Sequence, residues 1–259
     1  MINFSAIELA SQGWVENQPF PHFVVDDFFE KNVAKRLEAE FPQFGDKLWH
    51  EYGNAIEVKK VCNNWNSFPE TTYKCFSYLN SAEFLSFLSR TLFNDLELFS
   101  DPGLNGGGWH IHSSGGKLNT HLDYSLHPKL GMQRKLNIIV YLNSEWREEW
   151  GGSLGLWGSE SNSAPGKLVR EVVPRFNRAI IFDTTKNSWH GLPNPLACPS
   201  DQFRKSLAVY YLVPAESEVD PRAKALFAPT AEQAEDSEVL ELIKKRASVE
   251  TADQVYSKS

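Results

Sequence analysis

The stretch RKLNIIVYL, residues 134–142, alternates apolar side chains with others along a short run. Because successive side chains of a strand point to opposite sides, this run predicts a β-strand with two distinct faces. One face would carry the apolar side chains at even positions: Leu136, Ile138, Val140 and Leu142. The other face would carry Asn137, Ile139 and Tyr141.

Short extended runs of this kind continue on both sides of that stretch, separated by Gly, Pro and Asn clusters. We expect eight strands, at 108–112, 117–123, 133–142, 153–157, 167–173, 178–183, 188–191 and 203–212. Many short strands with turn signals between them are typical of a β-sandwich or jelly roll. The predicted fold class is therefore mainly β with flanking helices (α+β), around a jelly-roll core at residues 104–213.

Helical patterns flank this core on both sides. Residues 1–103 are expected to form a helical part, with a strand at 23–25, a helix that begins after Asp26 or Asp27, and two helices that break near Asn80–Ser81. Residues 43–68 look irregular. We expect residues 1–213 to form one domain.

From Pro214 onward, amphipathic patterns return at 217–227 and 235–247. In the second, Val239, Leu240 and Ile243 would share one side of a helix. Residues 214–259 are therefore predicted to be a C-terminal helical extension packed on the core.

The composition excludes several classes of protein. The chain has 259 residues and a formal net charge of −7, without a dense Lys/Arg stripe, so nucleic acid is not an expected partner. No apolar run approaches the ~20 residues of a membrane helix, and no signal peptide is expected at the N-terminus. Three cysteines without CxxC spacing predict a reducing, cytoplasmic location. The oligomeric state cannot be predicted.

A candidate metal site lies in the segment NTHLDYSLHP, residues 119–128. His121 and Asp123 are two positions apart, so on one strand they would share a face and could reach one cation. His190, in NSWHGLP, could be the third ligand. Two histidines and one carboxylate on one face of a metal form the facial triad of non-haem Fe(II) oxygenases.

The other histidines are weighed against plainer roles. His112 and His110 precede the triad on a neighbouring predicted strand, and either could line the pocket. His127 is expected in a turn before Pro128. The default for His22 and His50 is a structural role.

A second polar pair follows in QFRKSLAVYYL, residues 202–212. Arg204 and Ser206 would share one face of a strand whose apolar neighbours predict burial. A buried guanidinium is costly unless it is paired, and a carboxylate is its natural partner. That carboxylate could belong to the chain or to a ligand.

In this order, His121-x-Asp123, His190 and Arg204-x-Ser206 resemble the iron(II)- and 2-oxoglutarate-dependent oxygenases, and most closely their prolyl 4-hydroxylase-like branch. The resemblance extends to four further stretches and covers roughly residues 18 to 213. These stretches are PFPHFVVDDFF, HSSGGKLNTHLD, LNIIVYLNSEW and WGGSLGLW. The resemblance implies a double-stranded β-helix, a variant of the jelly roll.

The resemblance also implies roles for individual residues. His121, Asp123 and His190 would be the catalytic metal ligands for Fe(II). The far carboxylate of 2-oxoglutarate would pair with Arg204, with Ser206 as a second donor, and Tyr141 stands where the branch often has a tyrosine that contacts the same group. His112 stands where relatives commonly have a tyrosine, so it would contact 2-oxoglutarate or face the substrate.

The implied activity is that of a dioxygenase that uses O₂ and 2-oxoglutarate to hydroxylate an aliphatic C–H bond, with ascorbate as a stimulating reductant. Asp123 favours hydroxylation, because related halogenases have a small residue there. The substrate stays open between a prolyl residue of a protein or peptide and a free amino acid, peptide or sugar-like metabolite. Trp49, Trp65, Trp157 and Trp189 could line its entrance.

Two rivals come from other classes. A cupin-like metalloenzyme could use the same triad without 2-oxoglutarate, but it would leave Arg204 unexplained. A non-catalytic jelly-roll binding module would make the three aligned ligand types a coincidence.

Overall fold

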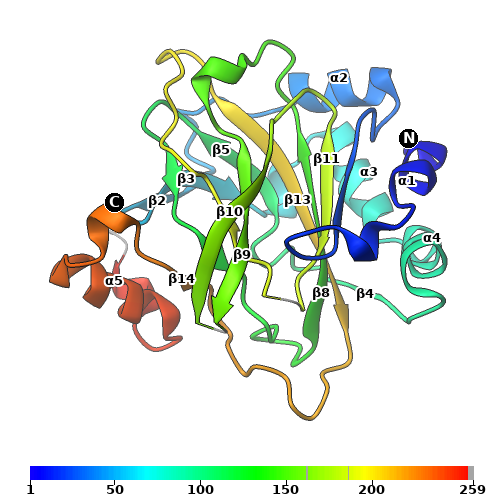
Figure 1. The fold of residues 1–259 in the computed structure, drawn as a ribbon. Helices are drawn as coiled ribbons and strands as arrows, with labels where there is room; N and C mark the ends of the chain where they lie inside the picture. Colours follow the sequence, from blue (N-terminus) through cyan, green and yellow to red (C-terminus); the bar gives the residue numbers. More distant parts are fainter. Residues whose placement is uncertain (162, 186, 256–259) are drawn as a thin grey trace.

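The structure is a computed structural model that describes residues 1–161, 163–185 and 187–255. Two antiparallel sheets pack against each other, with four helices along the outer face of the larger sheet (Figure 1). This arrangement is the predicted jelly roll with flanking helices. None of the described helices combines the length and the apolar character that a membrane-spanning helix needs.

The larger sheet has the strand order β1-β11-β8-β13-β5-β3-β2, and two short strands, β4 and β6, pair with β13 and β3. Its strands are β1 (His22–Val25), β2 (His50–Gly53), β3 (Glu57–Cys62), β4 (Phe99–Ser100), β5 (Gly108–His112), β6 (Lys117–Leu118), β8 (Gln133–Tyr141), β11 (Ala179–Asp183) and β13 (Arg204–Val213). The central strands β8 and β13 are almost wholly buried, as their apolar runs predict.

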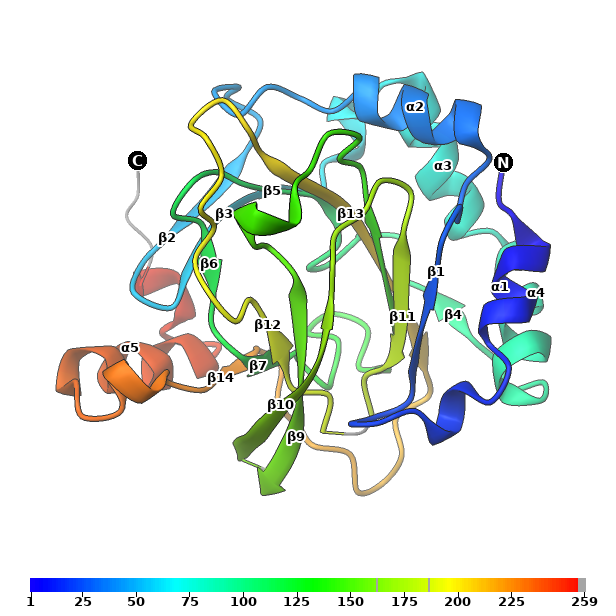
Figure 2. The ribbon, with the colours of Figure 1, turned by 45° about the horizontal axis from the view of Figure 1, so that its top comes forward.

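The smaller sheet has the order β10-β9-β12-β7-β14. Its strands are β7 (His121–Leu122), β9 (Leu154–Ser161), β10 (Ala164–Val172), β12 (His190–Gly191) and β14 (Leu226–Phe227). Figure 2 shows the three short strands side by side, with β12 and β7 facing β5 and β13 across the interior. The candidate metal ligands therefore come from the smaller sheet, and the candidate arginine from the larger one.

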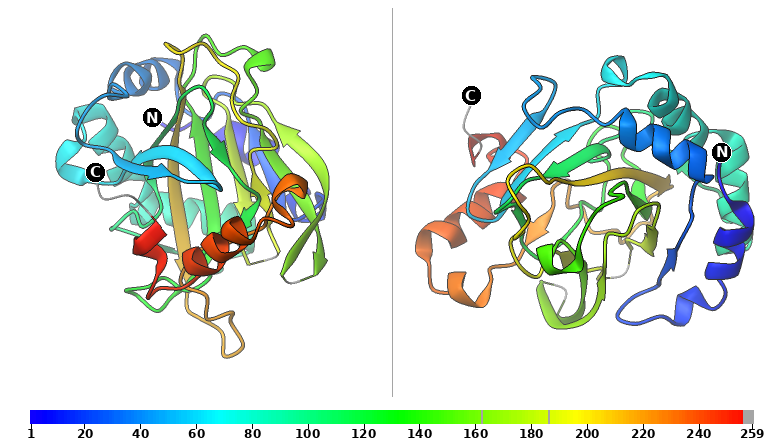
Figure 3. Two further views of the ribbon diagram at one scale, coloured as in Figure 1. Left: turned by 90° about the vertical axis from the view of Figure 1, so that its left-hand side faces the viewer. Right: turned by 90° about the horizontal axis from the view of Figure 1, so that it is seen from above.

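The helices are α1 (Phe4–Ala10), α2 (Lys31–Ala39), α3 (Glu70–Leu79), α4 (Ala82–Phe93) and α5 (Ser237–Ala247). Single 3₁₀ turns lie at Trp14–Glu16, Trp65–Ser67, Glu148–Trp150, Ala231–Gln233 and Ala252–Val255. The first four helices cover the outer face of the larger sheet, and α5 lies on the other side of the molecule (Figure 3).

The two faces of β8 face different environments, as its alternation predicts. Leu136, Ile138 and Val140 pack with the helices in the main hydrophobic core. Tyr141, with Ile139 packed beside it, joins a second apolar cluster between the two sheets. Burying the outer face stabilises the helix layer by about 25 cal/mol for each Å² of apolar surface removed from water.

Three predictions of local structure are wrong. Residues 43–68 are not wholly irregular, because β2 and β3 form a hairpin whose second strand pairs with β5. The predicted strand 117–123 is two strands, β6 and β7, because the chain passes from the larger sheet to the smaller one between them. The segment 217–227 is not helical, and its last two residues form β14 instead.

Two smaller differences concern helix ends and faces. Glu30, not Asp26 or Asp27, precedes the first turn of α2, since Asp26 binds Arg178 instead. On α5, Val239 is buried but Leu240 is 41 % exposed.

Candidate active site

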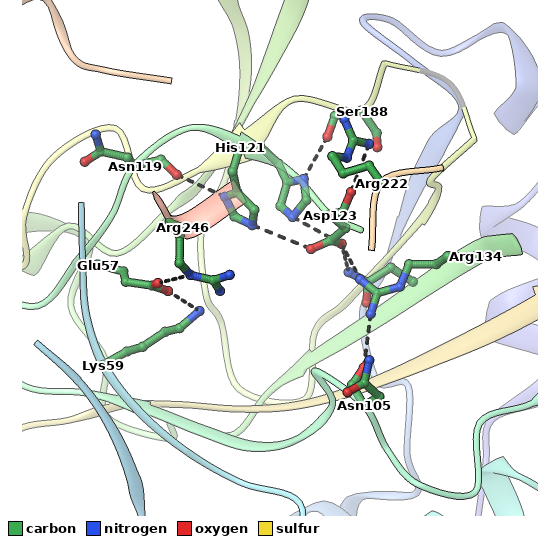
Figure 4. A network of polar contacts seen from close by, with 12 residues as sticks. Glu57, Lys59, Asn105, Asn119, His121, Asp123, Arg134, Ser188, Arg222 and Arg246 are labelled. Atoms are coloured by element: carbon green, nitrogen blue, oxygen red, sulfur yellow. Dashed lines mark hydrogen bonds and ion pairs between the residues drawn. The ribbon is translucent and has the colours of Figure 1, made fainter. Parts of the chain in front are cut away.

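Three side chains converge where β7 and β12 meet. His190 lies directly opposite His121 in the antiparallel pairing of these strands, and Asp123 follows His121 by two positions. The Nε2 atoms of His121 and His190 lie 3.6 Å and 3.7 Å from the two carboxylate oxygens of Asp123. One ligand atom from each residue lies within 4.8 Å of the other two, so the three could hold one metal ion (Figure 4).

Backbone carbonyls orient both imidazoles. Nδ1 of His121 lies 3.0 Å from the oxygen of Asn119, and Nδ1 of His190 lies 2.7 Å from the oxygen of Ser188. Because a carbonyl oxygen only accepts, each Nδ1 must carry a proton and donate it to this contact. In the neutral ring, Nε2 then has a free lone pair on the side of Asp123. Burial, and then His121, lower the pKa of His190 to about 4, which favours the neutral form that a metal needs.

Arg134 is the counter-charge of the candidate carboxylate ligand. Its Nη1 lies 3.1 Å from Oδ2 of Asp123, and Nδ2 of Asn137 donates to the same oxygen at 3.4 Å. Burial alone would raise the pKa of Asp123, but Arg134 and the two histidines hold it well below its usual range. Asp123 is therefore ionised at neutral pH, as a metal ligand must be.

Arg134 is itself held rigidly. Its guanidinium carbon lies 3.5 Å from the centre of the Tyr124 ring and 3.4 Å from that of Tyr210. Its Nη2 also donates to the carbonyl of Asn105 at 3.1 Å. A cation stacked between two aromatic faces loses little side-chain freedom on binding, so Asp123 meets a preorganised partner.

A β-bulge explains why Arg134 reaches the site. In the alternation of β8, Arg134 belongs with Leu136 on the outer face. The pairing of β8 with β13 shifts by one residue between Leu136 and Arg134, leaving Lys135 as the extra residue. Such a bulge breaks the alternation of the strand, so the side chain of Arg134, just before the bulge, points into the interior instead of toward the helices. Nothing in the residue spacing predicts this.

The larger sheet forms the opposite wall of a cavity of about 210 Å³ that also contains the three candidate ligands. Arg204 lies directly opposite His112 of β5, and Ser206 lies opposite both His110 and Tyr141. All but Tyr141 line the cavity, and the Tyr141 ring centre lies 4.9 Å from the guanidinium carbon of Arg204.

Arg204 is buried and forms no ion pair with a carboxylate of the described residues. Its Nε donates to the carbonyl of Gly152 at 2.7 Å, which leaves the two terminal nitrogens for other partners. Burial lowers the pKa of Arg204 from its usual value. A buried cation of this kind is costly unless a negative group joins it, so the cavity is built for an anion.

Several polar atoms near Arg204 also lack hydrogen-bond partners in the described structure. They are both ring nitrogens of His112 and Nε2 of His110. Burial, and then Lys59, lower the pKa of His110 to about 3, so its imidazole is neutral. Buried polar groups are nearly always bonded, so these atoms indicate a polar ligand.

The remaining histidines have other partners. His127 lies in a loop after β7, and its Nε2 is 3.4 Å from the buried carboxylate of Asp101. His22 is buried on β1, where Nη1 of Arg170 lies 3.0 Å from its Nε2. His50 is exposed on β2, with its ring against Tyr52.

The expectation that four tryptophans line the entrance is wrong. Trp49 and Trp65 belong to the outer hydrophobic core, and Trp157 and Trp189 pack around Leu122 behind β7. None of the four is among the described residues that line the cavity. Large apolar rings are used to fill the core here.

A set of residues that the motifs did not indicate completes the cavity wall. Phe227 of β14 stacks on His121, with the ring centres 5.0 Å apart and the planes at 22°. Glu57 and Lys59 of β3 and Arg246 of α5 also line the cavity. A signal for Phe227 could have been its place in the short apolar run 225–228, but the amphipathic pattern around it favoured a helix.

Comparison with known proteins agrees with this geometry. The profile of the 2OG-Fe(II) oxygenase superfamily matches residues 107–212. The chain is 26 % identical over 190 residues to a prolyl 3-hydroxylase, OGFOD1, of Xenopus laevis, a match that covers 71 % of this chain and 33 % of that protein. The chain therefore spans about a third of the length of that relative.

Solved structures share the fold. A prolyl 4-hydroxylase of Pseudomonas putida superposes with a TM-score of 0.57 at 13 % identity, over 81 % of this chain and 100 % of that one. A prolyl hydroxylase of Trichoplax adhaerens, solved with a peptide of hypoxia inducible factor, also gives a TM-score of 0.57, at 15 % identity over 81 % and 90 % of the two chains. The chain therefore has the fold of these prolyl hydroxylases, and residues 107–212 match the profile of the 2OG-Fe(II) oxygenase superfamily.

Proposed function

We propose that this chain is a dioxygenase that hydroxylates an aliphatic C–H bond with Fe(II), 2-oxoglutarate and O₂. The observation that carries the proposal is Arg204. It is a buried cation without a carboxylate partner among the described residues, and it lines the same cavity as the two histidines and Asp123. A dicarboxylate could bind a metal held by the three candidate ligands with one end and form an ion pair with Arg204 with the other.

The residues present fit this cofactor pair. His121, Asp123 and His190 would hold Fe(II) through two imidazoles and one carboxylate, with a face left open toward the cavity. Arg204 would bind the far carboxylate of 2-oxoglutarate, with Tyr141 and Ser206 as further donors and the unpartnered nitrogens of His112 beside it. When bound, iron and 2-oxoglutarate supply the oxidation of the C–H bond by O₂, which also yields succinate and CO₂.

The chain itself supplies position and charge. Arg134 and Asn137 hold the Asp123 carboxylate, and the carbonyls of Asn119 and Ser188 fix the imidazoles, so the ligands are preorganised before any metal binds. This arrangement spares the protein the cost of ordering them during the reaction.

For the substrate, we propose a prolyl residue of a protein or peptide. The relatives described above are named prolyl hydroxylases, and these names support the proposal for this chain. The second candidate is a free small molecule, such as an amino acid or a sugar-like metabolite. A cupin-like enzyme that works without 2-oxoglutarate would leave the buried Arg204 without a partner.

We also propose a reducing, cytoplasmic location, and that residues 1–213 form one domain on which residues 214–259 pack as a C-terminal extension. In support, the three cysteines are buried and unpaired, and β14 belongs to the smaller sheet. Ascorbate would keep the metal reduced.

The test is a succinate assay on the full chain with Fe(II), ascorbate and 2-oxoglutarate, with and without proline-containing peptides and free amino acids. We expect slow succinate release without substrate and faster release with the right one. Mass spectrometry of that substrate should show a gain of one oxygen atom.

Asp123→Ala is the matched inactive variant, and succinate release at the wild-type rate from it would contradict the assignment. Turnover that needs metal but not 2-oxoglutarate would favour the cupin-like alternative. Hydroxylation of a free metabolite but of no peptide would favour the second substrate class.

A further inference from the structure

The segment that follows the larger sheet is part of the cavity wall. The cavity is lined on one side by residues in and just before β14, namely Ala223, Lys224, Ala225 and Phe227. Arg246 of α5 also lines it. The matching superfamily profile ends at residue 212, so this wall lies beyond the part of the chain that carries the superfamily's own pattern. A wall of this kind is where a substrate preference particular to this chain can reside.

Backbone pairing fixes this segment to the strand of the candidate ligands. Leu226 and Phe227 pair with Leu122 and His121. The backbone N–H groups of Ser125 and Leu126 both donate to the carbonyl of Arg222, at 2.8 Å and 3.1 Å. The segment therefore follows the metal-site strand over several residues, and its side chains have fixed positions relative to the ligands.

A second set of contacts ties the segment to the larger sheet. Nε of Arg246 donates to Oε1 of Glu57 at 2.9 Å, and Nζ of Lys59 lies 3.5 Å from Oε2 of the same carboxylate. Figure 4 shows Glu57 between Arg246 and Lys59, in contact with both. Glu57 has a wholly buried side chain, whereas those of Lys59 and Arg246 are each 13 % exposed.

The charges of the cavity wall do not balance. Five cationic side chains line it, Lys59, Arg134, Arg204, Lys224 and Arg246, against two carboxylates, Asp123 and Glu57. In the proposed function, Arg134 is the ion-pair partner of Asp123, and Arg204 binds the far carboxylate of 2-oxoglutarate. Of the other three cations, Lys59 and Arg246 contact Glu57, whereas Lys224 forms no ion pair within the described residues. This local excess occurs in a chain whose net charge is −7.

We infer that Lys224, together with Lys59 and Arg246, binds an anionic group of the substrate and so selects a carboxylate-bearing substrate. The inference rests on the proposed function. Cations in a partly enclosed cavity attract an anion more strongly than the same cations on an open surface, because water screens them less. The carboxylate could be that of a free acid or that of an acidic residue beside the reacting one in a peptide.

The experiment uses the full chain loaded with Mn(II) and 2-oxoglutarate, so that binding is measured without turnover. Isothermal titration calorimetry would compare two pairs of probes. The first pair is N-acetylproline and its methylamide, and the second is the capped peptides Ala-Pro-Glu and Ala-Pro-Gln. We expect the acid of at least one pair to bind at least fivefold more tightly than its neutral partner. The pair that shows the preference identifies the source of the carboxylate.

Variants test the residues. Lys224→Glu should abolish or reverse the preference, and Lys244→Glu, at an exposed position of α5, is the matched control that should keep it. Arg246→Gln alone would remove an ion-pair partner of the buried Glu57 carboxylate and so could destabilise the fold. It is therefore combined with Glu57→Gln, which removes that buried charge as well. The double variant should keep part of the preference, since Lys224 and Lys59 remain.

Equal binding of acid and neutral probes in both pairs, or a preference that survives Lys224→Glu, would overturn the inference. Failure of the proposed function is read separately, from the titration of 2-oxoglutarate itself. If the chain binds Mn(II) and 2-oxoglutarate but binds the acid and neutral probes of each pair with equal affinity, the proposed function stands and the inference about Lys224 is wrong.

Discussion

The carbonyl oxygen of Gly152 accepts a 2.7 Å hydrogen bond from Nε of Arg204 and so fixes the direction in which the guanidinium faces the cavity. Gly152 has a φ of 78°, and a Cβ placed on it would lie 3.0 Å from Cδ of Arg204 and 3.3 Å from Cζ2 of Trp146. The turn before β9 therefore needs a residue without a side chain, and the arginine depends on that turn.

Gly152→Ala should weaken 2-oxoglutarate binding about tenfold while Mn(II) binding stays unchanged, because the added methyl group displaces Arg204 but not the candidate metal ligands. Titration calorimetry measures both constants. Gly151→Ala is the control, since Gly151 has a similar φ of 71° but only one atom at 4.0 Å from the site of its Cβ. Equal losses in the two variants would mean that backbone strain, not contact with Arg204, causes the effect.

Arg204→Met should raise the stability of the chain without 2-oxoglutarate, while it weakens 2-oxoglutarate binding at least a hundredfold. Replacing a buried, unpaired cation by an apolar side chain of similar length removes its desolvation cost, a gain of about 1–3 kcal/mol. Urea unfolding measures the first effect and calorimetry the second. Lys205→Met, on the opposite face of β13, should show neither, and a less stable Arg204→Met would contradict this account of the cavity.

Much of this site follows from residue spacing, but only within single strands. The motifs place His121 near Asp123, and Arg204 near Ser206, because side chains two apart share a face. The same rule predicts the two faces of β8. Spacing within one strand does not give the register that sets His190 directly opposite His121, since that depends on how distant strands pair.

The other features of the site come from local irregularities and long-range pairing. The bulge at Lys135 turns Arg134 inward against the alternation of its own strand. The segment before α5 looks helical by its pattern, yet its backbone pairs with residues 121–126, and this tertiary pairing overrides the local preference. The hairpin of β2 and β3 is missed because its strands carry charged side chains at a sheet edge.

Mn(II) or Co(II) should raise the melting temperature of the wild-type chain by about 5–10 °C at a concentration a hundredfold above the dissociation constant, because a metal that binds only the folded state stabilises it by about 2.7 kcal/mol. Asp123→Ala should lose this increase, since it removes the charged ligand of the three. Thermal unfolding followed by calorimetry, with and without EDTA, is the measurement.

Asp183→Ala is the control for the loss of a buried acid. Asp183 pairs with Lys135 at 2.6 Å and does not line the cavity. This variant should be less stable than the wild type but keep the increase with metal. A metal-dependent increase that survives in Asp123→Ala would show that the ion binds elsewhere.

Acid should destabilise the metal-free chain in part through His22. Burial, and then the charge of Arg170, lower the pKa of His22, and Nη1 of Arg170 lies 3.0 Å from its Nε2, an arrangement that suits a neutral ring. The unfolded chain, in which the pKa is about 6.5, then binds more protons than the folded chain below that pH. The contribution of neutral His22 to the free energy of unfolding is therefore complete above about pH 6.5. As the pH falls from there to the lowered pKa of the folded chain, that contribution decreases by up to about 1.4 kcal/mol for each pH unit.

His22→Phe should therefore reduce the difference in unfolding free energy between pH 7.5 and pH 5, measured by urea unfolding in EDTA. The phenyl ring can keep the edge-on contact that His22 makes with Phe20, so the variant changes the charge more than the packing. Part of the difference should remain, because His110 and His190 also have lowered pKa values. His50→Phe, at an exposed position, should leave the difference unchanged. If His22→Phe also left it unchanged, the protonation of His22 would not be coupled to folding.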